Sequence, residues 1–259
     1  MDNKSTEIGS YWIEKYEKDA RKNWDLFYKR NSTHFYKDRH WLSNATSQDG
    51  FEFFNTLSTS SLHSLHILEV GCGVGNTLYP ILQEYSEFIH TMHAFDFSSN
   101  AIQLLLQHQQ YPEYHSQIHA FQFDITTTSI SRHIPSHSID SICLFFVLSS
   151  ISPEKHEFVL NQLSQTVKVG GRLLFRDFCH GDLAESRFDS TQSKLSNRFY
   201  VRQDGTRSYF FIREHFIELV ERLQWKVIRC EAVQRVILNR KSNQEMNRIW
   251  LQAELAKME

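Results

Sequence analysis

The sequence of 259 residues is poor in the features that mark secreted, disulfide-bonded or membrane-spanning proteins. Its four cysteines, Cys72, Cys143, Cys179 and Cys230, are widely spaced and form no C-x-x-C pair, so neither a disulfide framework nor a cysteine zinc site is indicated. The longest apolar run, residues 142–148, is far shorter than the roughly 20 residues that cross a bilayer. We therefore expect no membrane span.

Charge and targeting signals are also weak. The formal net charge of -2 identifies no partner, and the first ten residues contain no apolar stretch that would act as a secretory signal. Among the histidines, the i, i+4 pair His133/His137 brackets Pro135, and the pair His115/His119 has no third ligand beside it. We expect a protein without a metal site, located in the cytoplasm or shared between cytoplasm and nucleus.

What the sequence does contain is an alternation of strand-like and helix-like segments from residue 66 onward. Strands are predicted at 66–70, 90–97, 118–125, 139–149 and 172–178, and two more near the C-terminus. After the fourth strand, Ser152 and Pro153 predict the start of an amphipathic helix that ends at the pair Gly170 and Gly171. This pattern predicts a Rossmann-like α/β fold, with a mainly parallel seven-stranded sheet covered by helices on both faces.

Two segments fall outside this alternation. Residues 1–50 form an N-terminal segment rich in aromatic and basic side chains, and residues 179–211 form a long polar excursion after the fifth strand. Loops of this length inside a compact domain are usually functional or disordered, and the arginine and aromatic content of this one favours function. We therefore expect a domain over 51–259 that carries an insertion at 179–211 and is preceded by an N-terminal segment at 1–50.

The stretch "LEVGCGVGN" places Gly71 and Gly73 between the first strand and the helix that follows it. Glycines allow a sharp turn and a close approach of the backbone to a ligand, and the helix start offers free amide donors. The second strand ends in Asp96, where an acid can bind both hydroxyls of a ribose, and the third ends in Asp124, which can accept from an adenine amine. The alternative for either acid is a cap on the next helix. Together, loop and acids resemble the class I S-adenosylmethionine-dependent methyltransferases.

The region after the fourth strand narrows the acceptor. It reads "FFVLSSISPEK" and contains neither the Pro-Cys pair of enzymes that methylate carbon 5 of cytosine nor the Asn/Asp-Pro-Pro-aromatic box of enzymes that methylate exocyclic amines. Cys143 lies inside the strand and is better explained as a small buried side chain than as a nucleophile. What remains is an acceptor with an available lone pair, for which the protein mainly aligns the reactants and excludes water.

Five stretches resemble one family within this class. "NWDLFYKRNSTHFYKDRHWL", "LEVGCGVGN", "FVLSSISPEK", "LLFRDF" and "NRFYVRQDGTRSYFF" are similar to the enzymes that form 3-methylcytidine at position 32 of tRNA anticodon loops. The resemblance runs from about Trp24 to Phe211. Ring nitrogen 3 of cytosine is a neutral nucleophile, in agreement with the missing cysteine and proline motifs. The sequence departs from the family at Phe178, where the pattern usually has tyrosine, so no role of that hydroxyl is carried over.

The resemblance implies S-adenosyl-L-methionine as cofactor and tRNA as substrate. It singles out no catalytic residue, and it implies cofactor contacts from Trp24, Tyr28, Gly71, Gly73, Asp96, Asp124 and Phe145. Trp24 and Tyr28 are four residues apart, so on a helix they share one face and would cover the cofactor; the alternative is an aromatic staple to the core. Candidate contacts to the RNA are Lys29, Arg30, Lys37, Arg39, Arg176, Asp177, Arg202, Arg207 and Tyr209. For the basic residues the alternative is a solvated surface charge, and for Arg176 and Asp177 a salt bridge to the insertion at 179–211.

The wording "NWDLFYKRNST" is closer to the family members that act on serine tRNAs, a branch that works with seryl-tRNA synthetase. That resemblance implies this partner, which the residues themselves do not identify. Two other functions stay open at this level. A small-molecule methyltransferase would share the core without needing the basic segment or the insertion, and a non-catalytic adaptor would keep the fold for docking alone.

Overall fold

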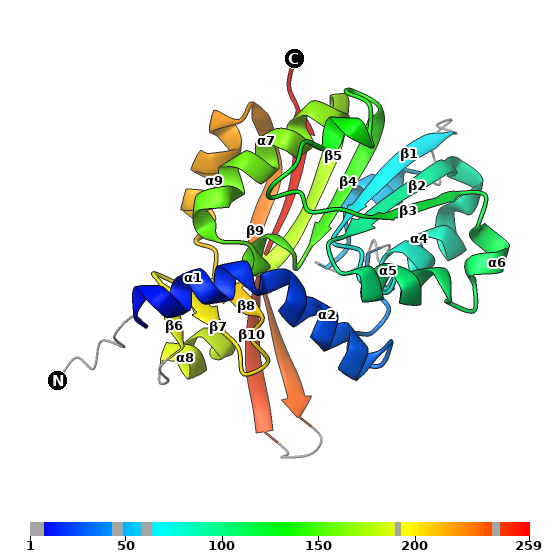
Figure 1. Ribbon diagram of the computed structural model, residues 1–259. Coiled ribbons are helices and arrows are strands. Elements are labelled where there is room, and N and C mark those ends of the chain that lie inside the picture. The colour runs from blue at the N-terminus through cyan, green and yellow to red at the C-terminus, as the bar shows by residue number, and fades with distance from the viewer. Residues whose placement is uncertain (1–7, 43–48, 58–63, 190–192, 240–243) are drawn as a thin grey trace.

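The computed structural model describes residues 8–42, 49–57, 64–189, 193–239 and 244–259. Parts of the expected N-terminal segment, 1–7 and 43–48, and of the expected insertion, 190–192, lie outside the described residues. Within the described part the chain forms one large sheet with helices on both faces and a small second sheet beside it (Figure 1).

The large sheet has seven strands in the order β3-β2-β1-β4-β5-β10-β9. In this order, each strand from β3 across β2, β1 and β4 to β5 pairs in parallel with the next, whereas β10 is antiparallel to both β5 and β9. This arrangement confirms the predicted Rossmann-like, mainly parallel sheet. The strands are β1 (Leu65–Val70), β2 (Ile89–Asp96), β3 (Ile118–Gln122), β4 (Ile139–Phe145), β5 (Val167–Phe178), β9 (Trp225–Asn239) and β10 (Gln244–Lys257).

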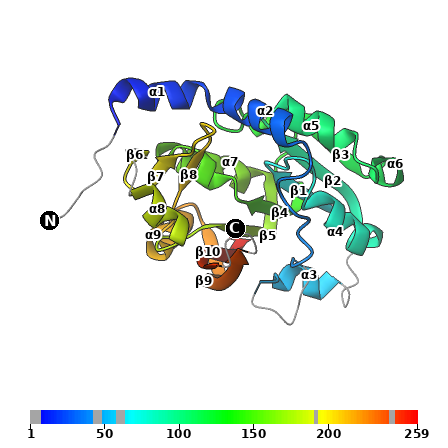
Figure 2. The same ribbon diagram turned by 90° about the horizontal axis from the view of Figure 1, so that it is seen from below.

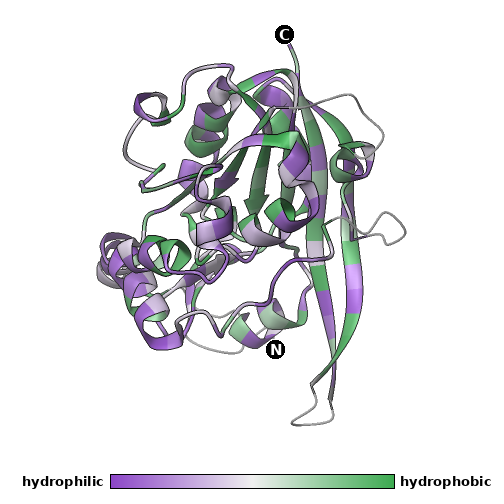
Figure 3. Ribbon diagram, turned by 90° about the vertical axis from the view of Figure 1, so that its right-hand side faces the viewer, coloured by the Kyte–Doolittle hydropathy of each residue, from purple (hydrophilic) through white to green (hydrophobic). Residues whose placement is uncertain are grey.

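Helices cover the sheet because its strands are apolar on both faces. One face packs against α7 (His156–Thr166) and α9 (Arg213–Arg222) around the fully buried Phe175. The other packs against α3 (Glu52–Leu57), α4 (Leu78–Tyr85), α5 (Ser99–Leu106) and α6 (Tyr111–Tyr114). In Figure 3 the strands at the middle of the molecule are predominantly green, as expected for strands buried on both sides. The carboxyl ends of the parallel strands are therefore left as the accessible edge.

Two boundaries differ from the sequence-based expectation. Strand β4 ends at Phe145, not at residue 149, because Phe146 adopts a left-handed backbone with φ 60° and a short 3-10 turn, Leu148–Ser150, follows. The predicted glycine stop is wrong: helix α7 ends at Thr166, and Gly170 and Gly171 lie inside β5. Val167 pairs with Ile139 and Arg172 with Ser141 of β4, so the two glycines lie at an irregularity inside the strand.

The insertion folds into structure of its own. It contains a helix and a three-stranded antiparallel sheet: α8 (Leu183–Asp189), β6 (Lys194–Ser196), β7 (Phe199–Val201) and β8 (Arg207–Tyr209). Leu195, Phe199 and Val201 form a small apolar cluster with Ile13 and Tyr16 of the N-terminal segment. The insertion and the N-terminal segment, far apart in sequence, are thus packed on each other.

The N-terminal segment forms two consecutive helices, α1 (Ser10–Lys18) and α2 (Ala20–Asn31). In Figure 1 they cross in front of the lower part of the domain, and in Figure 2 they run along its upper edge, with α1 beside the small sheet and α2 beside α5. A charged cluster fixes α1: the Glu17 carboxylate pairs with Arg207 of β8 and Lys155 and accepts from the Ser152 hydroxyl. The pairing with Arg207 lowers the pKa of Glu17 to about 2, against the opposing effect of burial. The segment is therefore packed against the domain.

Candidate functional site

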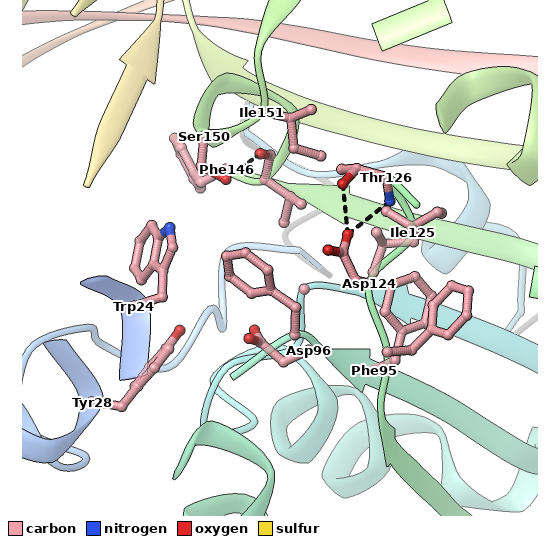
Figure 4. A pocket seen from close by; sticks show the side chains of 15 residues that line it. Trp24, Tyr28, Phe95, Asp96, Asp124, Ile125, Thr126, Phe146, Ser150 and Ile151 are labelled. Carbon is pink, nitrogen blue, oxygen red and sulfur yellow. Dashed lines mark hydrogen bonds between the residues drawn. The ribbon is translucent and has the colours of Figure 1, made fainter. Parts of the chain in front are cut away.

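A pocket lies where the carboxyl ends of β1, β2, β3 and β4 face helix α2 (Figure 4). Parallel α/β sheets bind ligands at this edge, as the sequence predicts. Its lining residues are Trp24, Tyr28, Val70, Gly71, Phe95, Asp96, Phe97, Phe123, Asp124, Ile125, Thr126, Phe146, Val147, Ser150 and Ile151.

The glycine turn forms the floor of this pocket. Gly71 and Gly73 have φ values of 62° and 53°, a left-handed backbone that other residues adopt at a cost. The Gly73 N–H donates to Asp96 Oδ2 at 3.0 Å. The turn after β1 is therefore bonded directly to the acid at the end of β2, as required if both are to contact one ligand.

Asp96 is the buried carboxylate of the site, with 6% of its surface exposed. Its Oδ1 accepts from the Ser98 N–H at 2.9 Å, and its Oδ2 accepts from Gly73. Burial raises the pKa of Asp96 to about 6, against the lowering effect of these backbone hydrogen bonds. The carboxylate is ionised at neutral pH and is held rigidly beside the pocket, which suits an acceptor for two ribose hydroxyls.

Asp124 follows β3 on the other side of the pocket. Its Oδ1 accepts from the Thr126 N–H at 2.9 Å and from the Thr126 hydroxyl at 2.7 Å, the two bonds drawn in Figure 4. The carboxylate is thus oriented by its own turn. Asp96 and Asp124 therefore line the same pocket, at the positions that the sequence predicts.

Helix α2 supplies an aromatic wall. The rings of Trp24 and Tyr28 stack with centroids 5.9 Å apart and face the acids and Phe146 across the pocket (Figure 4). Tyr28 is buried, and burial raises the pKa of its phenol well above the usual value. The expected shared face of the two rings is observed, and it closes the pocket on the side away from the sheet.

Two expected cofactor residues, Gly73 and Phe145, do not line the pocket, and Phe145 lies in the core. Its ring stacks on Phe51, 5.3 Å between centroids, and contacts Trp41 edge-on. Phe146 lines the pocket in its place. Neighbouring side chains of a strand point to opposite faces, so Phe145 and Phe146 cannot both face the pocket. Because β4 ends at Phe145 and Phe146 adopts a left-handed backbone, it is Phe146 that faces the pocket. The strand was predicted to continue to residue 149, which hid this change.

Arg39 also lies in a different environment from the one predicted. Its guanidinium donates to the Thr77 hydroxyl at 2.6 Å and lies over the rings of Phe145 and Phe146. Burial lowers the pKa of Arg39, against the opposing charge of Glu69, and burial raises the pKa of Glu69 to about 7. Arg39 is thus partly buried, and its guanidinium is engaged by Thr77 and by the ring of the pocket residue Phe146 instead of standing free for an RNA phosphate.

Arg176 and Asp177, expected near the acceptor, are both buried. The Arg176 guanidinium is 4% exposed, pairs with Asp49 at 2.8 Å and lies between the rings of Trp41 and Trp250. The Asp177 carboxylate accepts from the backbone N–H groups of Ser149 and Phe178. Burial raises the pKa of Asp177 to about 6. Arg176 does form a salt bridge, but with Asp49 of the N-terminal segment and not with the insertion, and Asp177 orients the turn after β4.

Of the three candidates in the insertion, Arg202 lies near the site, over the Phe178 ring that neighbours the pocket residue Phe146, and Arg207 and Tyr209 do not. Arg207 is 6% exposed and bonded to Glu17 and to the Ser152 hydroxyl, so it is a structural residue and not an RNA clamp. Tyr209 packs edge-on against Phe211 in the domain core, which leaves its ring poorly placed to stack on a base. Nothing in the sequence indicated which residues Arg207 and Tyr209 would contact.

Arg202 belongs to an aromatic and basic cluster beside the pocket. The rings of Phe146 and Phe178 are 5.4 Å apart, and the guanidinium groups of Arg202 and Arg248 lie 5.3 and 5.9 Å from the Phe178 ring. Arg248, on β10, was not singled out from sequence, because nothing local to it signals the approach of β10 to the pocket. Lys29, Arg30 and Lys37 are exposed, as a phosphate-binding face requires.

Alternative chemistries find little support among the described residues. No group of three or more histidine, cysteine, aspartate or glutamate side chains in that part of the chain has the geometry of a metal site. No helix within the described ranges is long and apolar enough to span a membrane. The burial of Cys143 in β4 raises the pKa of its thiol well above the usual value, which confirms it as a core residue.

Comparison with solved structures supports the fold. A Burkholderia thailandensis 1,6-didemethyltoxoflavin-N1-methyltransferase, solved with its substrate and S-adenosylhomocysteine, matches with a TM-score of 0.64 at 12% identity, over 98% of this chain and 93% of that one. A putative methyltransferase of Haloferax volcanii, solved with the Trm112 activator, also gives 0.64 at 11% identity, over 93% and 98%. At these identities the likeness concerns the fold alone.

Comparison with sequences goes further. The family model described as a methyltransferase domain matches residues 16–229. The rat protein named tRNA N(3)-cytidine methyltransferase METTL6 is 41% identical over 96% of this chain and 84% of its own length. The Schizosaccharomyces pombe protein named tRNA N(3)-methylcytidine methyltransferase trm141 is 38% identical over 95% and 96%. The zebrafish protein named tRNA N(3)-cytidine methyltransferase METTL2 is 34% identical over 95% and 76%. The chain belongs to the S-adenosylmethionine-dependent tRNA N(3)-cytidine methyltransferase family.

Proposed function

We propose that this protein transfers a methyl group from S-adenosylmethionine to ring nitrogen 3 of cytidine 32 in the tRNA anticodon loop, forming 3-methylcytidine. The observation that carries the proposal is the pocket itself. Its glycine turn, its two acids and its aromatic wall come together in a chain that is 41% identical to a tRNA N(3)-cytidine methyltransferase.

The residues around the pocket fit this cofactor. Asp96 would hold the ribose hydroxyls, Asp124 the adenine amine, and Trp24 and Tyr28 would cover the nucleoside from helix α2. The bound cofactor supplies a methyl group on a sulfonium ion. Gly71 and Phe146 line the same pocket, so the backbone turn and the ring beyond it limit where that methyl group can lie.

The acceptor would approach through the cluster of Phe146, Phe178, Arg202 and Arg248. Nitrogen 3 of cytosine attacks with its own lone pair, so the reaction needs alignment and exclusion of water more than a general base. The base must leave its stack to reach the pocket, and an aromatic ring beside arginines suits an unstacked base. The product ring is cationic, and the buried carboxylate of Asp177, beside Phe178 on β5, would favour that charge.

Residues 1–50 would then have two roles, cofactor cover by α2 and contact with tRNA phosphates by Lys29, Arg30 and Lys37. Serine tRNAs as substrates, and seryl-tRNA synthetase as a partner, are the finer part of the proposal. Their support is the similarity of "NWDLFYKRNST" to the branch that acts on those tRNAs.

The direct test is methyl transfer from labelled cofactor to transcripts of single tRNAs, followed by nucleoside analysis. We expect 3-methylcytidine in a serine tRNA and none in the same tRNA with uridine at position 32. Methylation of a metabolite extract without methylation of any tRNA would instead support the small-molecule alternative. Failure to bind S-adenosylhomocysteine would support the adaptor.

Reversing the charge of Lys29 and Lys37 is expected to weaken tRNA binding and to flatten its dependence on salt. Each lost phosphate contact lowers the slope of log affinity against log salt concentration by roughly 0.7 to 1. The measurement is a salt titration of tRNA binding to Lys29→Glu/Lys37→Glu and to the unaltered protein.

Arg222→Glu is the matched control, because Arg222 is an exposed basic residue at the far end of helix α9. It should leave the slope unchanged. Equal slopes for the unaltered protein and the double variant would contradict the assignment of these two lysines.

A further inference from the structure

Asp25 connects helix α2 to the core of the domain. Its Oδ1 accepts from the Ser98 hydroxyl at 2.7 Å and lies 3.5 Å from the backbone N of Asn100. The Asn100 side-chain amide donates in return to the backbone carbonyl of Asp25 at 3.0 Å. The contact joins residues more than seventy positions apart, and it lies at the N-terminus of α5, where a negative charge is favourable.

Ser98 carries this contact to the cofactor acid. Its side chain is fully buried, its hydroxyl accepts from the Ala101 N–H at 3.2 Å as the N-cap of α5, and its own N–H donates to Asp96 Oδ1. Asp96 Oδ2 in turn accepts from Gly73. A continuous chain of hydrogen bonds therefore runs from Asp25 on α2, through Ser98 and Asp96, to the glycine turn.

On the same helix, Trp24 precedes Asp25 and Tyr28 lies one turn later. The Tyr28 hydroxyl is so close to Gly73 that an added Cβ there would lie 2.6 Å from it. On the side of the insertion, the Asn23 amide donates to the Gly205 carbonyl at 2.9 Å. Asn23 thus ties α2 to the insertion, and Asp25 ties it to the loop after β2.

We propose that Asp25 is a positioning residue for the cofactor: it seats the Trp24 and Tyr28 wall against the same loop that holds Asp96. The wall and the acid are then presented to the nucleoside as one unit. Without the Asp25 carboxylate, the buried Ser98 hydroxyl has lost its acceptor, and the bond of Asn100 to the Asp25 backbone carbonyl remains as the hydrogen bond between α2 and α5. An asparagine at this position keeps an oxygen acceptor while it removes the charge.

The experiment compares Asp25→Ala, Asp25→Asn and the control Glu14→Ala in calorimetric titrations with S-adenosylhomocysteine. Loss of a hydrogen bond to a charged group predicts affinity about tenfold weaker for Asp25→Ala. Asp25→Asn should stay within about threefold of the unaltered protein, since the acceptor is retained. Glu14, an exposed acid on α1, should have no effect. Circular dichroism and thermal unfolding without ligand establish that all three variants are folded.

Repeating Asp25→Ala in a Trp24→Ala background separates positioning from a general loss of stability. If Asp25 acts by seating the aromatic wall, its removal should cost less than about twofold once Trp24 is absent, because neighbouring residues in one unit are not additive. Steady-state kinetics should show a raised KM for the cofactor with little change in kcat. An unchanged affinity for Asp25→Ala, or an equal loss in both backgrounds, would overturn the proposal.

The inference rests on the proposed placement of the cofactor, and the two fail in different ways. If Asp96→Ala binds S-adenosylhomocysteine as well as the unaltered protein does, the placement of the cofactor is wrong. If Asp96→Ala loses binding while Asp25→Ala keeps it, only the role of Asp25 is wrong. Neither result depends on tRNA.

Discussion

Replacing Asp96 with alanine is expected to lower the affinity for S-adenosylhomocysteine by about 100-fold or more. The substitution removes the acceptor for two ribose hydroxyls. It also leaves the Gly73 and Ser98 N–H groups without the carboxylate to which they donate. Losing a buried charged hydrogen-bonding group costs about 3 kcal/mol, which corresponds to this factor. Isothermal titration calorimetry measures it directly.

The matched control is Asp140→Ala. Asp140 is also an acid that accepts from a backbone N–H, that of His66, and pairs with Lys168, but it lies at the opposite end of the parallel strands. Its removal should leave cofactor affinity unchanged. Comparable losses for both variants would show that the effect of Asp96→Ala comes from general destabilisation.

The same carboxylate predicts how cofactor binding depends on pH. Burial raises the pKa of Asp96 to about 6, so the group is ionised at pH 7.5 and becomes protonated as the pH falls through 6. A protonated carboxyl accepts hydrogen bonds more weakly, so affinity should fall between pH 7 and pH 5 in the unaltered protein. The stability of the free protein has the opposite trend for this group, because a raised pKa means that protonation favours the folded state. Asp96→Asn should bind weakly with little pH dependence over this range.

Substituting Gly71 by alanine is expected to damage both stability and cofactor binding. Gly71 has φ 62°, and an added Cβ would lie 2.5 Å from one γ-methyl of Val147 and 3.0 Å from the other. Left-handed strain and overpacking each cost about 1–3 kcal/mol, so the free energy of unfolding should fall by about 2–4 kcal/mol. Val147 and Gly71 both line the pocket, so the affinity for S-adenosylhomocysteine should fall as well. Urea unfolding and calorimetry give the two quantities.

Gly170 offers the control for backbone strain alone. It has φ 77° but no atom within 4 Å of an added Cβ, and it lies in the first part of β5, away from the pocket. Gly170→Ala should therefore cost stability without changing cofactor affinity. In the double variant Gly71→Ala/Val147→Ala the clash is removed, so part of the affinity should return relative to Gly71→Ala. No recovery would mean that strain, and not Val147, accounts for the loss.

The cofactor half of the site was largely predictable because its signals are local. Apolar strand patterns, a glycine turn directly after β1 and single acids after β2 and β3 specify a geometry once the sheet is parallel. Parallel order brings the carboxyl ends of these strands to one edge, and Gly71, Asp96 and Asp124 do line one pocket. The i, i+4 spacing of Trp24 and Tyr28 likewise fixed their common face on α2.

The acceptor side was less predictable, and Phe145 shows why. Its prediction depended on where β4 ends: the strand was predicted to run to residue 149 but ends at Phe145, and the left-handed backbone of Phe146 brings the next ring to the pocket. Arg248 shows a second reason. It reaches the site only because β10 lies beside β5 in the sheet, an adjacency that no local pattern in its own segment encodes.

The sequence by itself determined the fold class, the cofactor pocket's glycine turn and acids, and the family, since each depends on short-range order along the chain. Only the tertiary structure decided which basic side chains face solvent. Arg39, Arg176 and Arg207 look like Lys29 and Lys37 in sequence, but Arg176 and Arg207 are buried and Arg39 is partly buried, whereas the two lysines are exposed. Their partners Glu69, Asp49 and Glu17 lie 30, 127 and 190 positions away along the chain. An arginine is buried only where a distant segment brings a carboxylate or an aromatic ring to it, so its environment is a property of the packed chain.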